Sequence, residues 1–86
     1  METIIAAGLN NEALQLDDAG DYVGAERKHL EALRLKIQGN GEQSIQVALT
    51  KNGLGELYLK MGELDKAQNM LEGADAIRSG MPFSES

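Results

Sequence analysis

His29 is the only histidine in the 86-residue sequence, and histidine is the side chain that most readily exchanges a proton near neutral pH. Catalysis by a general base also requires a positioned partner and a pocket. The sequence contains no cysteine, and no pattern around His29 suggests a catalytic triad. A single histidine on the apolar face of a predicted helix is more often packed in a core than catalytic. We therefore predict that the protein is not an enzyme and has no catalytic residue.

Other polar patterns do not predict a cofactor or a metal site. The segment Gly39-Asn40-Gly41 is too short for a phosphate-binding loop, and no Lys-Ser or Lys-Thr pair follows it. Asp17, Asp18 and Asp21 lack the spacing of a calcium loop, and the capping of a helix explains them better. Without cysteine, neither a zinc–thiolate site nor a disulfide can form. We expect no cofactor and no metal.

Composition and charge narrow the class of protein and of partner. At 42% hydrophobic and 26% charged residues, the chain is predicted to be one soluble globular domain. The formal net charge of −6 argues against nucleic acid or an anionic membrane as a partner, because both require a basic surface. No apolar run reaches the roughly 20 residues of a membrane span, and the N-terminus lacks a signal-peptide pattern. We expect a cytoplasmic location.

The spacing of apolar residues predicts an all-α fold. Four helices are expected, at about 2–17, 22–37, 43–60 and 64–78, with Ser44 as an alternative cap of the third. Gly20 and Gly62 fit the left-handed residue just past a helix, and Gly39–Gly41 should break the second helix. We predict a domain over residues 1–80 and a frayed tail over residues 81–86.

The predicted core is assembled from one stripe on each helix. Five glycines fall inside the helices, and Gly55 has the strongest case for close approach of a neighbouring helix. The inward residues are predicted to be Ile5, Leu9, Ala13 and Leu16; Tyr22, Ala25, His29, either Ala32 or Leu33, and either Leu35 or Lys36; Ile45, Val47, Leu49, Leu54, Leu57, Tyr58 and Met61; and Leu64, Ala67, Leu71, Ala74 and Ile77.

The sequence repeats itself at a constant offset of 42 residues, which is the distance from Gly20 to Gly62. Such a period is typical of stacked helical repeats, in which each pair of antiparallel helices buries its apolar face against the next pair. The same offset pairs Leu16 with Tyr58, Ala25 with Ala67, His29 with Leu71, Ala32 with Ala74, and Leu35 with Ile77.

The second copy resembles the tetratricopeptide repeat, in which Leu-Gly-x-x-Tyr is followed by Ala and by a bulky residue four positions later. The matching residues are Leu54, Gly55, Tyr58, Ala67 and Leu71, with a weaker copy at Ala13, Leu16, Ala25 and His29. The period exceeds the usual ~34 residues and resembles the long-helix subclass of kinesin light chains. The resemblance covers residues 6–78. It implies two stacked hairpins, about 2–37 and 43–79, in a right-handed superhelical array.

The resemblance also implies a function, which is binding of a peptide in a concave groove lined by the first helix of each unit. In the long-helix subclass, asparagines on that helix often hold the backbone of the peptide, since an amide both donates and accepts hydrogen bonds. The residues expected to bind the peptide are Asn10, Asn11 and Asn52, with side-chain contacts from Leu49, Glu56 and Lys60.

The charge of the predicted groove indicates which kind of peptide it should bind. Some members of the family grip a C-terminal carboxylate with several Lys or Arg side chains, and this sequence departs from that pattern. The first helix carries Glu2, Glu12, Asp17 and Asp18 and no basic residue, and the basic residues of the third are Lys51 and Lys60. We therefore expect a neutral or basic protein or peptide ligand.

Two units leave one end of the stack open, and such stacks usually need three or more units. Leu57, Met70, Leu71 and Ile77 are predicted to form an exposed apolar surface there, which would favour a homo-oligomer. A tail residue such as Phe83 could cover the surface instead. The alternative function is therefore self-assembly, or a role as part of a longer repeat scaffold.

Overall fold

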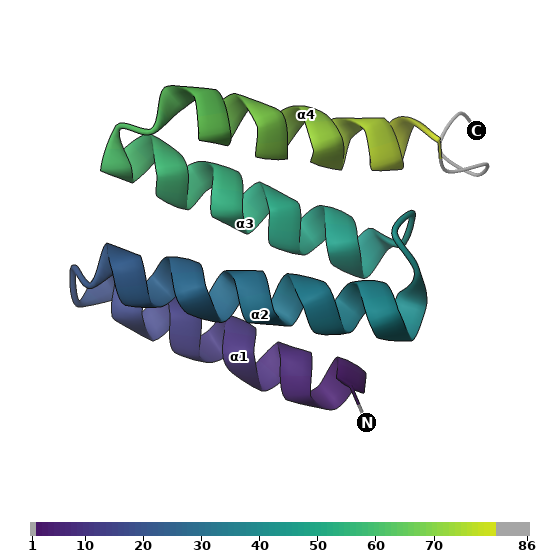
Figure 1. The fold of residues 1–86 in the computed structure, drawn as a ribbon, viewed down its shortest axis with the longest axis horizontal. Helices are drawn as coiled ribbons and strands as arrows, with labels where there is room; N and C mark the ends of the chain where they lie inside the picture. Colours follow the sequence, from purple (N-terminus) through teal and green to yellow (C-terminus); the bar gives the residue numbers. More distant parts are fainter. Residues whose placement is uncertain (1, 81–86) are drawn as a thin grey trace.

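A computed structural model describes residues 2–80, and within that range the chain folds into four α-helices and no strand. The helices are α1 (Glu2–Asp18), α2 (Tyr22–Asn40), α3 (Ile45–Met61) and α4 (Leu64–Ser79). They follow one another as antiparallel hairpins, with α2 packed against both α1 and α3, and α4 packed on α3 (Figure 1). The predicted all-α fold is thereby confirmed. The predicted tail, with Phe83, lies outside the described residues.

The helix ends agree with the prediction within a residue or so, except at the end of α2. This helix continues through Gly39 to Asn40 and ends only at Gly41, where φ is +85° and the backbone N–H donates to the Ile37 carbonyl. The break therefore falls within the predicted segment Gly39–Gly41, but the predicted end at about Ile37 is three residues too early. A glycine with helical dihedral angles weakens a helix but does not end it, whereas a glycine with positive φ does.

The two turns that end α1 and α3 have the same hydrogen bonds, 42 residues apart. The Gly20 N–H donates to the Asp17 carbonyl at 2.9 Å, and the Asp21 N–H donates to the Leu16 carbonyl at 2.8 Å. Both glycines have positive φ, as the Schellman-type end of a helix requires. In the second turn, the same bonds join Gly62 to Leu59 at 3.1 Å and Glu63 to Tyr58 at 2.9 Å.

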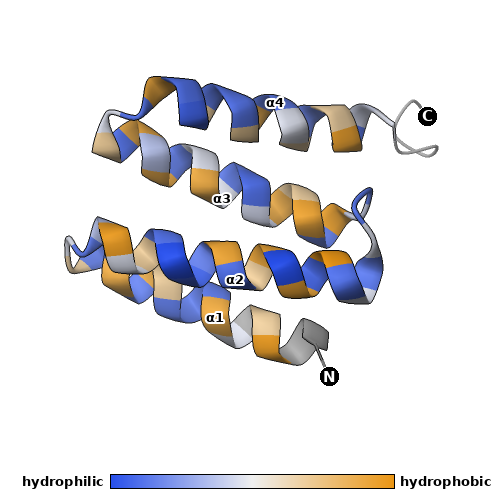
Figure 2. Cartoon of the chain, viewed as in Figure 1, coloured by the Kyte–Doolittle hydropathy of each residue, from blue (hydrophilic) through white to orange (hydrophobic). Residues whose placement is uncertain are grey.

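Small residues bring the helices together, and Leu33 links the two halves of the core. Leu33 of α2 packs against both buried clusters of the second hairpin (Figure 2 shows the apolar stripes that face one another). One cluster contains Val47, Ala48, Ala74 and Ile77, and the other contains Leu54, Tyr58 and Ala67. The second hairpin thus packs on the first through α2.

The close approach predicted at Gly55 is confirmed. A Cβ added to Gly55 would lie 2.6 Å from the Cγ and Cδ2 atoms of Leu71 and 3.4 Å from the carbonyl of Ala67. Only a residue without a side chain leaves α4 room to pack this closely on α3.

The expectation that Leu57 and Ile77 are exposed is wrong. Leu57 is 1% exposed and Ile77 is 3% exposed. Leu57 is covered because α3 lies between α2 and α4, and Ile77 is covered because it packs with Val47 and Ala74. Of the predicted association residues, Met70 and Leu71 remain partly exposed.

Four apolar residues predicted to point inward are exposed instead. Each lies at the edge of an apolar stripe, where no neighbouring helix covers it. The reason is that α1 and α4 are the outer helices of the row and that α3 leaves one face open. These residues are Ile5, Ile45, Leu49 and Leu64, which are 41–65% exposed. In the described part of the chain, no helix is both long and apolar enough to cross a membrane.

Candidate functional site

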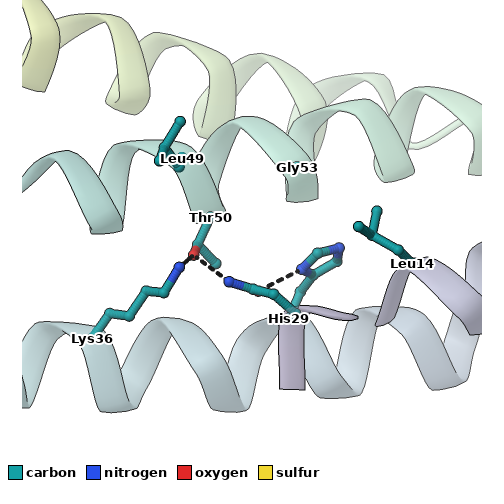
Figure 3. Close-up of a pocket in the computed structure, with 7 residues that line it drawn as sticks. Leu14, His29, Lys36, Leu49, Thr50 and Gly53 are labelled. Carbon is teal, nitrogen blue, oxygen red and sulfur yellow. Dashed lines mark hydrogen bonds between the residues drawn. The ribbon is translucent and has the colours of Figure 1, made fainter. Parts of the chain in front are cut away.

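A pocket of about 240 Å³ opens between α1 and α3, with α2 as its floor (Figure 3). Leu14 and Leu49 stand at its rim and are 54% and 55% exposed. The lining residues are Asn10 and Leu14 of α1, His29 and Lys36 of α2, and Leu49, Thr50 and Gly53 of α3.

Helical spacing places these residues on one side of each helix. His29 and Lys36 are seven residues apart, or about two turns, and therefore lie on the same face of α2. Asn10 and Leu14 are one turn apart on α1. Gly53 keeps the space beside the imidazole open, because a Cβ there would lie 3.4 Å from the Cε1 atom of His29.

Four polar side chains form a chain of hydrogen bonds across the floor (Figure 3). Lys36 Nζ donates to Thr50 Oγ1 at 2.9 Å, and Asn10 Nδ2 donates to the same oxygen at 3.4 Å. The Asn10 Oδ1 atom then faces His29 Nδ1 at 3.2 Å. Since an amide oxygen can only accept, this contact is a hydrogen bond in the tautomer that carries a proton on Nδ1, which leaves Nε2 as an acceptor in the neutral form.

Burial affects the protonation of the two basic side chains in the floor of the pocket, His29 and Lys36. His29 is 5% exposed and Lys36 is 7% exposed. Burial lowers the pKa of His29, nearby Asp17 opposes that shift, and Lys36 adds to it. Burial also lowers the pKa of the Lys36 ammonium. Because both groups favour their neutral forms more than they would in water, an anion entering the pocket would strengthen their charged forms.

Two of the six residues predicted to bind a peptide line this pocket, namely Asn10 and Leu49. Asn11 is exposed on α1 and does not line it. The other three lie further along α3. Asn52 Nδ2 donates to Glu56 Oε2 at 3.4 Å, and Lys60 Nζ lies 3.0 Å from both carboxylate oxygens of Asp17.

Sequence reasoning missed five lining residues: Leu14, His29, Lys36, Thr50 and Gly53. His29 was correctly predicted to be packed, but not to border a cavity. The available signal was the spacing of His29 and Lys36, which puts two basic side chains on the inward face of one helix. That face was assigned to the core alone, because apolar periodicity does not distinguish a core from the floor of a pocket.

The arrangement is suited to binding. The hydrogen-bond partner of the imidazole is an amide, so no carboxylate orients His29 as a general base. Among the described residues, no group of three or more His, Asp and Glu side chains gathers as a metal site would require.

Comparison with known proteins places the fold in a family. No curated protein and no solved structure matches the chain. A family model described as tetratricopeptide repeat matches residues 4–78, which take in nearly the whole of the four helices. The chain therefore belongs to the tetratricopeptide repeat family.

Proposed function

We propose that the protein is a non-enzymatic interaction module that binds a peptide segment of another protein across the face shared by α1 and α3. The observation that carries this proposal is the pocket, in which the exposed Leu14 and Leu49 flank a floor of polar side chains. Sites that bind ligands are typically lined by apolar side chains together with a few polar groups at fixed positions. Tetratricopeptide repeats are generally protein–protein interaction modules, which supports the same function.

The peptide would extend from the pocket along α1 and α3. Asn10 uses one amide hydrogen and its oxygen within the floor, and its second hydrogen is available to a peptide carbonyl. Asn11, Asn52, Glu56 and Lys60 would contact the peptide beyond the pocket. The 42-residue period supports placement in the long-helix subclass, which likewise remains a proposal.

We retain a neutral or basic peptide as the expected ligand along this face, because the chain carries a net charge of −6. The acidic residues of α1 contribute less to this preference than the sequence suggested. Asp17 pairs with Lys60 at 3.0 Å, and Glu12 pairs with Lys28 at 3.2 Å.

A random-peptide display library tests the proposal directly. Peptides selected on the immobilised chain are measured by isothermal titration calorimetry against two variants, Leu49→Asp and Leu64→Asp. Leu49 lines the pocket, whereas Leu64 is 65% exposed at the start of α4 and serves as the matched control. We expect Leu49→Asp to weaken binding by about tenfold or more, because it places a charge on an apolar contact, and Leu64→Asp to leave binding unchanged. Equal effects of the two variants would contradict the proposal.

Self-assembly is the second candidate function, favoured by apolar groups on the terminal helix. Leu64 is exposed and Met70 and Leu71 are partly exposed on α4. Light scattering over about two decades of concentration distinguishes the two functions, since a monomer at every concentration removes this candidate. The cytoplasmic location and a place in a longer repeat scaffold remain predictions.

A further inference from the structure

Lys36 is the one buried lysine in the described part of the chain. It is 7% exposed, whereas every other lysine is partly or fully exposed. Within residues 2–80, its described hydrogen bond joins Nζ to the neutral hydroxyl of Thr50 at 2.9 Å. The described ion pairs belong instead to Lys28 and Lys60. Burying an ammonium group without a partner charge is unfavourable, so this environment favours the uncharged amine.

The surroundings of Lys36 combine a cavity with an apolar rim. Lys36 lines the pocket that opens to solvent between Leu14 and Leu49 (Figure 3). Among the described residues, no Asp or Glu lines this pocket. Burial lowers the pKa of the Lys36 ammonium, in agreement with this geometry. A lysine that is desolvated in an apolar pocket is an activated nucleophile, because its uncharged amine has a free electron pair.

We propose that Lys36 is a covalent capture site for a small aliphatic aldehyde, whose carbonyl carbon bonds to Nζ while its alkyl chain lies between Leu14 and Leu49. This inference goes beyond the proposed function and does not depend on it, since the aldehyde is held by its bond to Nζ and not by contacts of a peptide. The capture is stoichiometric, so it requires no catalytic turnover.

The bond forms by the chemistry of an imine. The electron pair of the uncharged Lys36 amine attacks the carbonyl carbon, and the carbonyl oxygen takes one amine proton, which gives a carbinolamine. The hydroxyl group then leaves with the second amine proton as water, and the C=N bond forms. No oxidant or reductant takes part, and water reverses the reaction by hydrolysis.

The charge and size of the product favour an aldehyde over other small electrophiles. An imine can be uncharged, so the apolar rim can cover it without burying a charge. Carbon dioxide would instead convert the amine into an anionic carbamate. The remaining basic group of the described lining is His29, and burial lowers its pKa and so favours the neutral imidazole. A volume of about 240 Å³ is below the range typical of drug-sized ligands and suits an alkyl chain of a few carbons.

Reductive trapping on the wild-type chain tests the proposal. The chain is incubated at pH 7 with butanal and sodium cyanoborohydride, which reduces an imine to a stable secondary amine. Peptide mapping by mass spectrometry then gives the rate of alkylation at each lysine, with the N-terminal amine mapped separately because its ordinary pKa is lower. We expect Lys36 to be alkylated about tenfold or more faster than Lys51 and Lys66, because an uncharged amine need not lose a proton before it attacks.

A second aldehyde tests the role of the pocket. Formaldehyde forms the same bond but has no alkyl chain to place between Leu14 and Leu49. The ratio of the rate at Lys36 to the rate at Lys51 should therefore be about tenfold higher with butanal than with formaldehyde, because only butanal buries apolar surface there. Lys28→Met is the matched control on the same helix as Lys36, and it should leave the rate at Lys36 unchanged because Lys28 pairs with Glu12 outside the pocket.

Faster alkylation at Lys36, with the larger ratio for butanal, supports the proposal. Alkylation at Lys36 that is no faster than at Lys51 and Lys66 overturns it, and so does an equal ratio for the two aldehydes. Neither result changes the binding of library peptides or its dependence on Leu49, so the proposed function stands or fails separately.

Discussion

Gly55 lies where the Leu71 side chain of α4 packs directly on the backbone of α3, and a side chain at this position would disturb that packing. We predict that Gly55→Ala lowers the free energy of unfolding, because the new Cβ would lie 2.6 Å from two atoms of Leu71. Overpacking of this kind costs about 1–3 kcal/mol, which outweighs or cancels the roughly 1 kcal/mol that alanine gains over glycine in a helix. Thermal unfolding followed by circular dichroism measures the change.

Gly8→Ala is the matched control, since no heavy atom lies within 4 Å of the position that its Cβ would take. At position 8 only the higher helix propensity of alanine acts. The free energy of unfolding should therefore rise by about 1 kcal/mol, which corresponds to about 4–8 °C in melting temperature for a domain of this size. A Gly55→Ala variant that gains as much as Gly8→Ala would contradict the packing described for Leu71.

At the residue scale, the polar residues of the pocket were harder to predict from the sequence than the residues of the packed core. The need for glycine at position 55 could be read from the repeat pattern, because the motif itself contains it. The position of Lys36 in the floor of the pocket could not be read in this way, because the other lining residues come mainly from α1 and α3, far along the chain. A pattern within one helix gives the face of a residue but not what the opposite helices leave uncovered.

At the scale of the element, the two hairpins begin their second helices with the same backbone but different caps. Asp21 (φ −88°, ψ 76°) accepts a hydrogen bond from the Gly24 N–H at 3.0 Å, whereas Glu63 (φ −90°, ψ 75°) makes no side-chain cap. We predict that Asp21→Ala costs about 1 kcal/mol and that Glu63→Ala costs clearly less. Both changes remove a negative charge near a helix start, so their difference isolates the capping bond. Urea unfolding of both variants measures it, and equal losses would show that the bond does not stabilise α2.

Helix ends were predictable where a residue with left-handed backbone determined them. Gly20 and Gly62 end their helices as expected, with positive φ. The end of α2 was placed about three residues too early because Gly39, Asn40 and Gly41 are all suited to a break, and the sequence does not distinguish which of them takes a positive φ. The spacing of apolar residues predicted the four helices correctly. It overestimated the core, because Leu49 and Leu64 lie where no neighbouring helix covers them.

At the scale of the whole molecule, several hydrogen bonds tie the first hairpin to the second, and the shortest of those described joins Tyr58 to Glu26. Tyr58 of α3 is 4% exposed and donates through its hydroxyl to Glu26 Oε2 of α2 at 2.6 Å. Leu33 supports the same contact by packing on both buried clusters of the second hairpin. Because each hairpin packs only on the other within residues 2–80, this interface decides whether the two units unfold together.

We predict that Tyr58→Phe lowers the free energy of unfolding by about 1–2 kcal/mol at neutral pH, because it removes a bond to a charged acceptor. A double-mutant cycle with Glu26→Gln checks that the loss belongs to the pair, since the double variant should lose less than the sum of the single ones. Additive losses would mean that the two side chains stabilise the fold independently.

The pH dependence of that loss provides a second measurement. Burial first, and then the hydrogen bond and charge of Glu26, raise the pKa of Tyr58 in the folded chain. A phenol with a raised pKa stabilises the fold below its unfolded value, about pH 10, and this contribution is lost as the pH rises above it. The stability advantage of the wild type over Tyr58→Phe should therefore be constant from pH 7 to 9 and shrink above about pH 10, by up to ~1.4 kcal/mol per pH unit. Other groups that titrate in this range are common to both proteins and cancel in the comparison. An advantage that stays constant to pH 11 would show that the Tyr58 phenol ionises as readily in the folded chain as in the unfolded one, and would contradict the raised pKa.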